Sequence, residues 1–301
     1  MGARMLKSTF FVLMLISGVA QGVEDASPQA DELQQLEAVV AYDDLQRTLI
    51  QWDLELAGGY EGRGERELAE QKRASAGERV ERILYQYVSF LAKFPDNAAA
   101  HNYYGEALAD LKGRHAQAAQ EWLRAIKLDP QLPDPHNNMG IYYGHFGNHD
   151  KAIDEFRKAV ELDPNVAEFH FDLALAYHNF RYVAMSKLGW TLPRLFEEIL
   201  KESRKARQLK PEDLEIATDY ARTFFGSENF KVTPDWPEAL AAWQYCLALT
   251  EEPTERFGIL LNLGRVALRM DRREEARGYL NQALSIQPDS PVAKKLIETA
   301  K

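Results

Sequence analysis

The stretch PDPHNNMGIYYGHFGNHDKAIDEFRKAVELDP, from Pro133 to Pro164, decides the fold of this chain. It predicts one helix, a tight Gly-Asn turn, and a second helix that an Asp-Pro pair ends. Pro130 and Pro164 lie 34 residues apart in the matching contexts KLDP and ELDP. A fixed period of about 34 residues is typical of stacked helical hairpins. The sequence therefore predicts an all-α repeat fold.

The same pattern recurs on both sides of this stretch. Pro95 precedes Pro130 by about one period, so the helix before Pro95 is expected to belong to a degenerate first unit. Two later units are longer than the period, because each has extra residues between its two helices. The expected units are 98–131, 132–165, 167–211, 214–253 and 257–288.

The placing of small residues in these units resembles the tetratricopeptide repeat (TPR) family. In the unit 132–165, Gly140 in the first helix and Ala152 in the second are small enough for the paired helices to approach closely. Pro164 ends the second helix. The resemblance covers roughly residues 78–301. It implies an all-α, right-handed superhelical solenoid of stacked antiparallel helix hairpins, and the binding of protein or peptide ligands.

The chain as a whole is expected to divide into five parts. The N-terminal helix is expected to end at Gly58-Gly59, and the polar residues 60–77 to form a mobile connector or a weak helix. The parts are a signal peptide at 1–22, a flexible tether at 23–30, the N-terminal helix, connector and degenerate repeat at 31–97, the TPR array at 98–289 with insertions near 180–193 and 226–235, and a C-terminal capping helix at 290–301.

The first residues have the pattern of a signal peptide. Arg4 and Lys7 precede a short apolar run, and small residues follow it, with cleavage expected after Ala20 or Gly22. The apolar run spans only about ten residues, short of the roughly 20 that a transmembrane helix needs. We therefore expect an exported protein, periplasmic or secreted, with an uncleaved anchor as the alternative.

Composition argues against several classes of function. The chain has 46 acidic and 36 basic residues, a net charge of −10, and no basic stripe for nucleic acid. Its one cysteine, Cys246, cannot form an internal disulfide and falls at a small core position. No catalytic or phosphate-binding motif occurs, and most histidines recur with the repeat rather than in a metal-binding spacing. No catalytic residue, cofactor or metal is expected.

The candidate binding site is the concave face, which stacked hairpins line with their first helices. Asparagine side chains there can hold a peptide backbone, because they both donate and accept hydrogen bonds. The face is expected to be acidic and amide-rich at its N-terminal end and basic at its C-terminal end. The alternative is a solvated face without a ligand. The predicted residues are Asn102, Glu106, Asn137, Asn138, Ile141, Phe171, Asp172, Leu175, His178, Thr218, Arg222, Leu261, Arg265 and Arg269.

The two insertions provide a second candidate surface. Their aromatic residues could form a partner-binding rim along one edge of the repeats. The alternative is that these side chains pack on one another and extend the helices. The predicted rim residues are Phe180, Tyr182, Trp190 and Phe230.

The resemblance and the candidate surfaces together favour one function. We expect an exported, non-enzymatic protein- or peptide-binding scaffold of the cell envelope that acts through its concave groove. One alternative is a structural or assembly factor that self-associates through the helix at 31–57. Another is a regulatory subunit of an envelope enzyme, which the sequence does not separate from the first.

Overall fold

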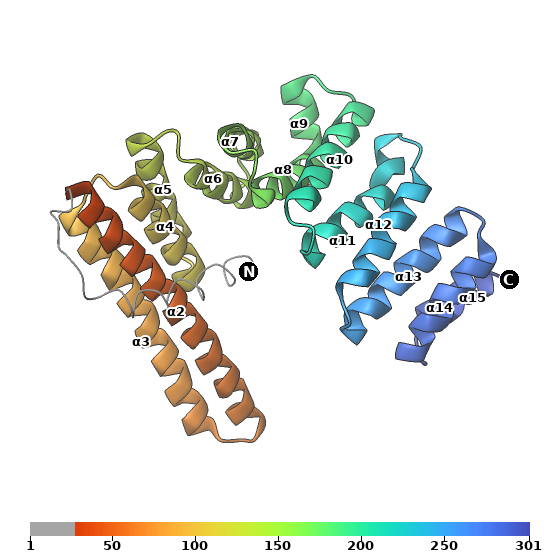
Figure 1. Ribbon diagram of the computed structural model, residues 1–301, viewed down its shortest axis with the longest axis horizontal. Helices are drawn as coiled ribbons and strands as arrows, with labels where there is room; N and C mark the ends of the chain where they lie inside the picture. The colour runs from red at the N-terminus through yellow and green to blue at the C-terminus, as the bar shows by residue number, and fades with distance from the viewer. Residues whose placement is uncertain (1–27) are drawn as a thin grey trace, which may run out of the picture. The chain divides into compact units, whose positions relative to one another are not determined.

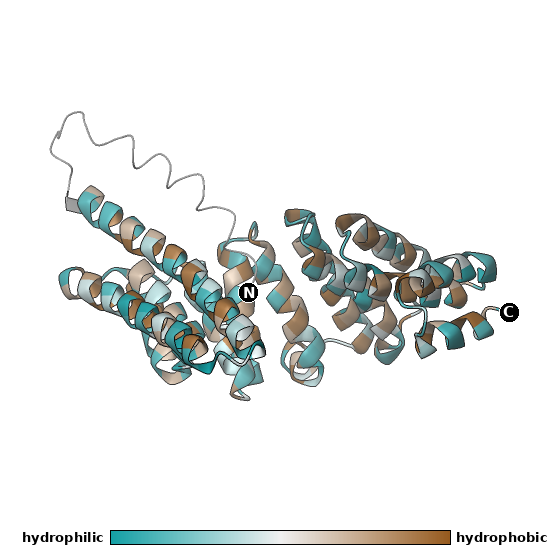
Figure 2. Ribbon diagram, turned by 90° about the horizontal axis from the view of Figure 1, so that it is seen from below, coloured by the Kyte–Doolittle hydropathy of each residue, from teal (hydrophilic) through white to brown (hydrophobic). Residues whose placement is uncertain are grey.

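The computed structural model describes residues 28–301, and within them the chain is helical and contains no strand (Figure 1). The predicted signal peptide and most of the predicted tether lie outside these residues. Within the described residues the chain divides into two compact units, with the division between Tyr142 and Tyr143. The boundary falls inside α6, and each unit has its own apolar interior. Figure 2 shows polar and apolar residues alternating around the helices, as amphipathic packing requires.

The first unit begins with two long helices and continues with hairpins of repeat length. Its helices follow one another along the chain with short turns between them. They are α2 (Pro28–Gly62), α3 (Arg66–Lys93), α4 (Ala98–Lys112), α5 (His115–Leu128) and the start of α6 (Pro133–His145).

The N-terminal helix is longer than the sequence predicted. It does not end at Gly58-Gly59 but continues to Gly62, and residues 28–30 of the predicted tether form its first turn. Residues 66–77 are the first half of α3, so a mobile connector there was the wrong alternative. Each glycine costs a helix about 1 kcal/mol. Packing against α3 offsets this cost, since Ala57, next to the glycines, is completely covered.

A buried carboxylate fixes the first half of α3 against α2. Asp53 accepts hydrogen bonds from Ser75 Oγ (2.8 Å), Arg79 Nε (3.0 Å) and Lys72 Nζ (3.2 Å). Burial acts to raise the pKa of Asp53, but these three donors outweigh it and lower the pKa. These interactions explain why a stretch with few large apolar residues is nevertheless a regular helix.

The α4–α5 hairpin shows why its first helix needs a small residue. Asn97 caps α4 by accepting a hydrogen bond from the Ala100 backbone N–H at 2.7 Å. Gly113 ends α4 in the left-handed region, with φ of 61°. A Cβ atom at Gly105 would lie 2.5 Å from Trp122 Nε1, so only glycine admits the indole of α5.

The second unit contains further hairpins and two inserted segments. It comprises the end of α6, α7 (His149–Leu162), α8 (Ala167–Asn179), α9 (Arg181–Leu188), α10 (Leu192–Leu209), α11 (Leu214–Thr223), the 3-10 helix η1 (Phe224–Phe230), α12 (Trp236–Leu249), α13 (Pro253–Arg269), α14 (Arg273–Ile286) and α15 (Pro291–Thr299).

Small residues set the packing of this unit too. A Cβ atom at Gly264 of α13 would lie 2.7 Å from Leu280 Cδ2 of α14. Cys246 is completely buried in the apolar cluster that Trp243 and Leu263 share, as the sequence predicted. Burial raises the pKa of its thiol to about 11, so the group is a neutral core residue.

The last helix, α15, covers the end of the final hairpin. Ala293 and Ala300 are completely buried, and Ala300 joins a cluster with Ala267 of α13 and Ala276 of α14. Within residues 28–301, no helix combines the length and the apolar character that a membrane crossing requires.

Candidate functional site

In the first unit, the predicted site residues form a polar network between successive first helices. Asn102 Nδ2 donates to Glu106 Oε1 at 2.8 Å within α4. Asn138 of α6 donates through Nδ2 to Asn102 Oδ1 at 2.9 Å and to Glu106 Oε1 at 3.2 Å. The structure therefore brings these side chains together, as the sequence predicted for one face, but they bind one another.

Burial limits what this network can offer to a ligand. Asn102 and Asn137 are both buried, so the prediction that they line an accessible groove is wrong. A side chain on the concave side of one helix is covered by the next first helix, and helical spacing alone does not reveal this. Ile141 is exposed and Asn138 half-buried, and they remain candidates for contact with a partner.

In the second unit, apolar packing removes two more predicted residues from the surface. Leu261 is buried in the cluster between α11, α12 and α13. Phe171 packs on Ala167, Ala206 and Ile216, which joins α8 to α10 and α11. The prediction that Leu261 contacts a ligand is therefore wrong. Phe171 is half-buried and serves mainly to pack these helices together.

A charged cluster lies where α8 and α11 meet. His178 is exposed, Arg222 is exposed, and Asp219 is half-buried and close enough to both to interact electrostatically. Burial raises the pKa of Asp219, and the electrostatic effects of Arg222 and His178 act against that rise. Across residues 28–301, Arg222 has no carboxylate within ion-pair distance, so its guanidinium is accessible to an anionic group.

Sequence reasoning missed Asp219. It lies beside the predicted Thr218, whose hydroxyl donates to the Leu214 carbonyl oxygen at 2.8 Å and so serves its own helix. The two residues are consecutive in α11, so their side chains point in different directions around the helix. An available signal was the Asp219-Arg222 spacing of three residues, which places opposite charges on one helix face. Asp172 and Leu175 of α8 are half-buried and stay candidates.

The predicted arginines of α13 differ in accessibility. Arg269 Nη1 lies 2.9 Å from Glu228 Oε1, and its guanidinium lies over the Trp236 ring at 5.6 Å. Arg265 is exposed and donates to Asn262 Oδ1 of its own helix at 2.9 Å. Arg265 is therefore the more accessible cation, whereas Arg269 mainly ties η1 and α12 to α13.

The predicted aromatic rim is mostly interior. Phe180 stacks on His149 with ring centroids 4.0 Å apart, and Trp190 contacts Tyr177 edge-on at 5.4 Å. Phe230 is only 1% exposed and packs on Phe196, so its prediction as a partner contact is wrong. These three rings therefore pack on helices α7, α8 and α10 of the repeats.

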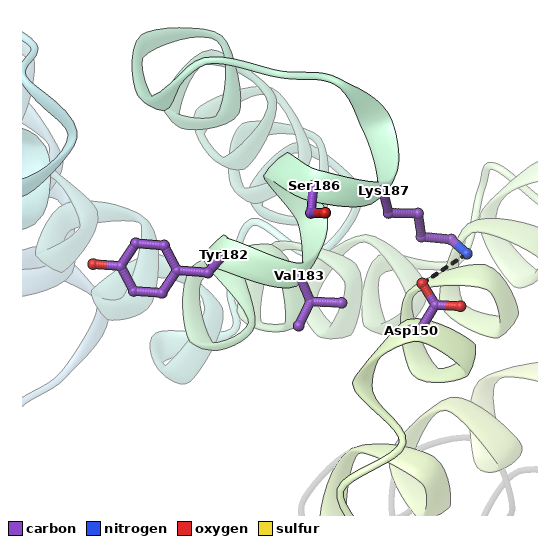
Figure 3. Close-up of a pocket in the computed structure, with 5 residues that line it drawn as sticks. All are labelled: Asp150, Tyr182, Val183, Ser186 and Lys187. Carbon is purple, nitrogen blue, oxygen red and sulfur yellow. Dashed lines mark hydrogen bonds and ion pairs between the residues drawn. The ribbon is translucent and has the colours of Figure 1, made fainter.

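Tyr182 is the exception among the rim residues. Its side chain is 71% exposed, with the Arg181 guanidinium 5.0 Å from its ring centroid. It borders a shallow hollow of about 310 Å³ between α7 and α9. Figure 3 shows Tyr182 and Lys187 pointing in opposite directions from α9, with Lys187 bound to Asp150. Hydrogen bonds to Asp154 and Asp150 raise the pKa of Lys187.

Two of the repeated histidines are structural. His101 Nδ1 lies 2.6 Å from Glu121 Oε2 and its Nε2 lies 2.9 Å from the Pro95 carbonyl oxygen. His170 makes the equivalent contacts, with Glu202 Oε2 at 2.5 Å and the Pro164 carbonyl oxygen at 3.0 Å. Among the described residues, no cluster of three or more His, Cys, Asp or Glu side chains is arranged to hold a metal ion.

Comparison with protein families identifies the repeat. Residues 111–145 and 147–179 match a family model described as TPR repeat. Residues 257–290 match another, described as tetratricopeptide repeat. These matches include the stretch around α6 and α7 and the hairpin of α13 and α14. No curated protein sequence matches the chain.

Solved structures of low sequence identity share the fold. YrrB, described as a TPR protein with an unusual peptide-binding site, is 16% identical over 70% of this chain and 97% of its own, with a TM-score of 0.55. Pseudomonas aeruginosa pilF is 16% identical, with 83% and 97% covered and a TM-score of 0.53. The C-terminal part of a Cytophaga hutchinsonii TPR repeat-containing protein is 15% identical, with 86% and 99% covered and a TM-score of 0.54.

Proposed function

Since the chain is a tetratricopeptide repeat protein, we propose that it is a non-enzymatic scaffold that binds an extended protein segment. The observation that carries this proposal is the accessible cation pair on first helices of the second unit, Arg222 of α11 and Arg265 of α13. Residues of both helices belong to one apolar cluster, and α12 contacts each of the two helices.

The chemistry of this surface fits a segment with acidic side chains. A guanidinium binds a carboxylate through two parallel hydrogen bonds, which fixes orientation as well as position. The half-buried Leu175 of α8 offers apolar contact beside the charged cluster. The solved structure of YrrB is described as containing a peptide-binding site, and peptide binding by the present chain is our proposal.

We also propose that the protein is exported to the cell envelope. The support is the order of Arg4 and Lys7, the apolar run at 10–16 and the small residues up to Gly22. Mass spectrometry of protein from the envelope fraction tests this proposal. The expected mature N-terminus follows Ala20 or Gly22, and an intact Met1 in a protein that remains in the cytoplasm would contradict export.

Peptide binding is tested with a displayed library of random peptides. Peptides selected on the protein are synthesised, and their affinities are measured by fluorescence anisotropy. Arg222→Ala and Arg265→Ala should each weaken binding about 10-fold or more, because each removes a charged partner. Arg277→Ala replaces a half-buried arginine of α14 that pairs with Glu274, and this control variant should change the affinity little.

Two outcomes would count against the proposal. One is that no selected peptide binds the soluble protein. The other is that the Arg222→Ala, Arg265→Ala and Arg277→Ala variants bind a selected peptide equally well. Circular dichroism of each variant confirms that helix content is unchanged, so a loss of affinity reports on the site.

A further inference from the structure

Helix α2 has two separate apolar faces, and α3 and α4 cover only one of them. The covered face includes Leu36, Ile50 and Ala57, which are all buried. It also holds the carboxylates of Asp43 and Asp53, which bind Tyr87 and Arg79 of α3. Packing within the first unit therefore explains why this face is apolar, but it does not explain the second apolar face.

The second face, which we call the seam, lies beside the covered face on α2 and is more exposed than it. Its residues alternate at spacings of three and four, the pattern of a helix that pairs with another helix. Leu45 is 56% exposed, Trp52 is 62% exposed and Leu56 is 37% exposed, while the other two members are half-buried. The seam consists of Tyr42, Leu45, Leu49, Trp52 and Leu56.

We propose that the seam binds the seam of a second copy of this chain, with the two α2 helices antiparallel. The sequence of the seam is self-complementary in that direction. With Leu49 on the two-fold axis, Tyr42 lies opposite Leu56 of the second copy, and Leu45 lies opposite Trp52. The central layer pairs two leucines, and each outer layer pairs an aromatic side chain with a leucine, which fills space without two indoles meeting.

Charge favours the antiparallel direction over the parallel one. Helix α2 is rich in acidic residues and has a single arginine, Arg47, which is paired with Asp43. A parallel pair would place Glu55 level with Glu55 of the second copy. In the antiparallel register the two Glu55 side chains lie at opposite ends of the seam, so these two like charges are kept apart.

The length of the seam sets the expected strength. From Tyr42 to Leu56 it extends about 20 Å at ~1.5 Å per residue. Stable interfaces bury about 800 Å² per partner, and a contact between two helices of this length buries less area than that. We therefore expect a dimer that dissociates on dilution at micromolar concentration. The inference is independent of peptide binding at Arg222 and Arg265.

Sedimentation velocity over a range of concentrations tests the proposal. The parent protein should change from monomer to dimer as concentration rises. In Leu45→Ala/Trp52→Ala the dissociation constant should increase about 100-fold, because both anchors are removed from both copies. Tyr85→Ala/Val88→Ala removes two exposed side chains of α3 and is the matched control, expected to dimerise like the parent. All residues replaced are exposed, so folding should be retained.

Cysteine cross-linking tests the direction of the helices. In a Cys246→Ala background, Leu49→Cys should form a disulfide-linked dimer under mild oxidation, since this position lies on the two-fold axis. Leu56→Cys should not, because it faces Tyr42 of the second copy. Cross-linking of both variants would indicate a parallel pair and overturn the antiparallel register.

Other outcomes overturn the proposal as a whole. A parent that stays monomeric at about 100 μM, far above the expected micromolar range, would show that no second copy covers the seam. A Leu45→Ala/Trp52→Ala variant that dimerises like the parent would show that the dimer uses another surface. Loss of dimerisation with peptide binding retained would separate this inference from the proposed function.

Discussion

At the residue scale, Gly105 and Gly264 in first helices are required by close contact with the second helix. A Cβ atom at Gly264 would meet Leu280 at 2.7 Å, whereas one at Gly278 would have no heavy atom within 4 Å. We predict that Gly264→Ala destabilises the protein by about 1–3 kcal/mol through overpacking. Gly278→Ala should instead stabilise it by about 0.5–1 kcal/mol, because alanine favours helix. Urea unfolding measures both, and equal effects would contradict the packing argument.

Through His101, the stability of the folded protein is expected to depend on pH. Burial acts to lower its pKa, but hydrogen bonding to Glu121 and to the Pro95 carbonyl outweighs this and raises it. The Glu121 carboxylate and the Pro95 carbonyl both accept hydrogen bonds, so the His101 ring can donate to both only when both of its nitrogens carry protons. The proton then stabilises the folded state below about pH 6.5, and this contribution is lost as the pH rises through the raised pKa.

The corresponding measurement is the thermal midpoint at several pH values. Between about pH 6 and pH 8.5 the midpoint of the parent should fall, and it should fall less in His101→Gln, which has no titrating ring. His145→Gln replaces an exposed histidine and is the control, expected to keep the parental slope. The same slope in all three proteins would show that His101 does not contribute.

At the element scale, α15 is needed to cover the last hairpin. Deleting residues 291–301 uncovers Ala267 and Ala276 and removes Ala293 from the apolar cluster around Leu280. Terminal caps protect the apolar face of repeat arrays. We predict a thermal midpoint several degrees lower for the deletion, at ~2–4 °C per kcal/mol. Val292→Ala, at an exposed position, should leave the midpoint nearly unchanged, and an equally stable deletion would mean that α15 does not cover the array.

The elements also show what sequence periodicity predicts well. The α6–turn–α7 stretch and the helix before Pro95 were predicted correctly, because large and small residues recur there at fixed spacing. The sequence left the first half of α3 open between a mobile connector and a weak helix, since its order depends on Asp53, a residue far away in sequence. Phe230 was misplaced for a similar reason, because an aromatic residue in an insertion has no repeat register to indicate which side it faces.

At the scale of the whole molecule, unfolding should proceed in steps. Repeats contact mainly their neighbours, so distant parts of a repeat chain can unfold separately. Each unit also has buried clusters of its own, around Phe90 in the first and Trp243 in the second. We predict that hydrogen exchange in increasing urea shows α3 and α12 losing protection at different concentrations. Loss of protection in all helices at one concentration would indicate a single cooperative unit.

The fold of the whole chain could be predicted from sequence more fully than its binding site. Pro130 and Pro164 mark a period, and a period determines the fold class. A binding site depends on which polar side chains remain accessible after neighbouring repeats pack. Asn102 and Arg222 occupy first helices alike, yet one is buried in a hydrogen-bond network and the other is exposed. That difference arises only when the helices are assembled.

The turn between α2 and α3 is a suitable place to insert a label. Residues 63–65 close the hairpin with Gly64 at a φ of 79°, and no side chain lies near its Cα. An epitope or a small fluorescent module inserted there would leave from an exposed tip, where chain additions are best tolerated. The protein could thus be followed in living cells with both ends of the chain unmodified, including the N-terminus on which its export would depend.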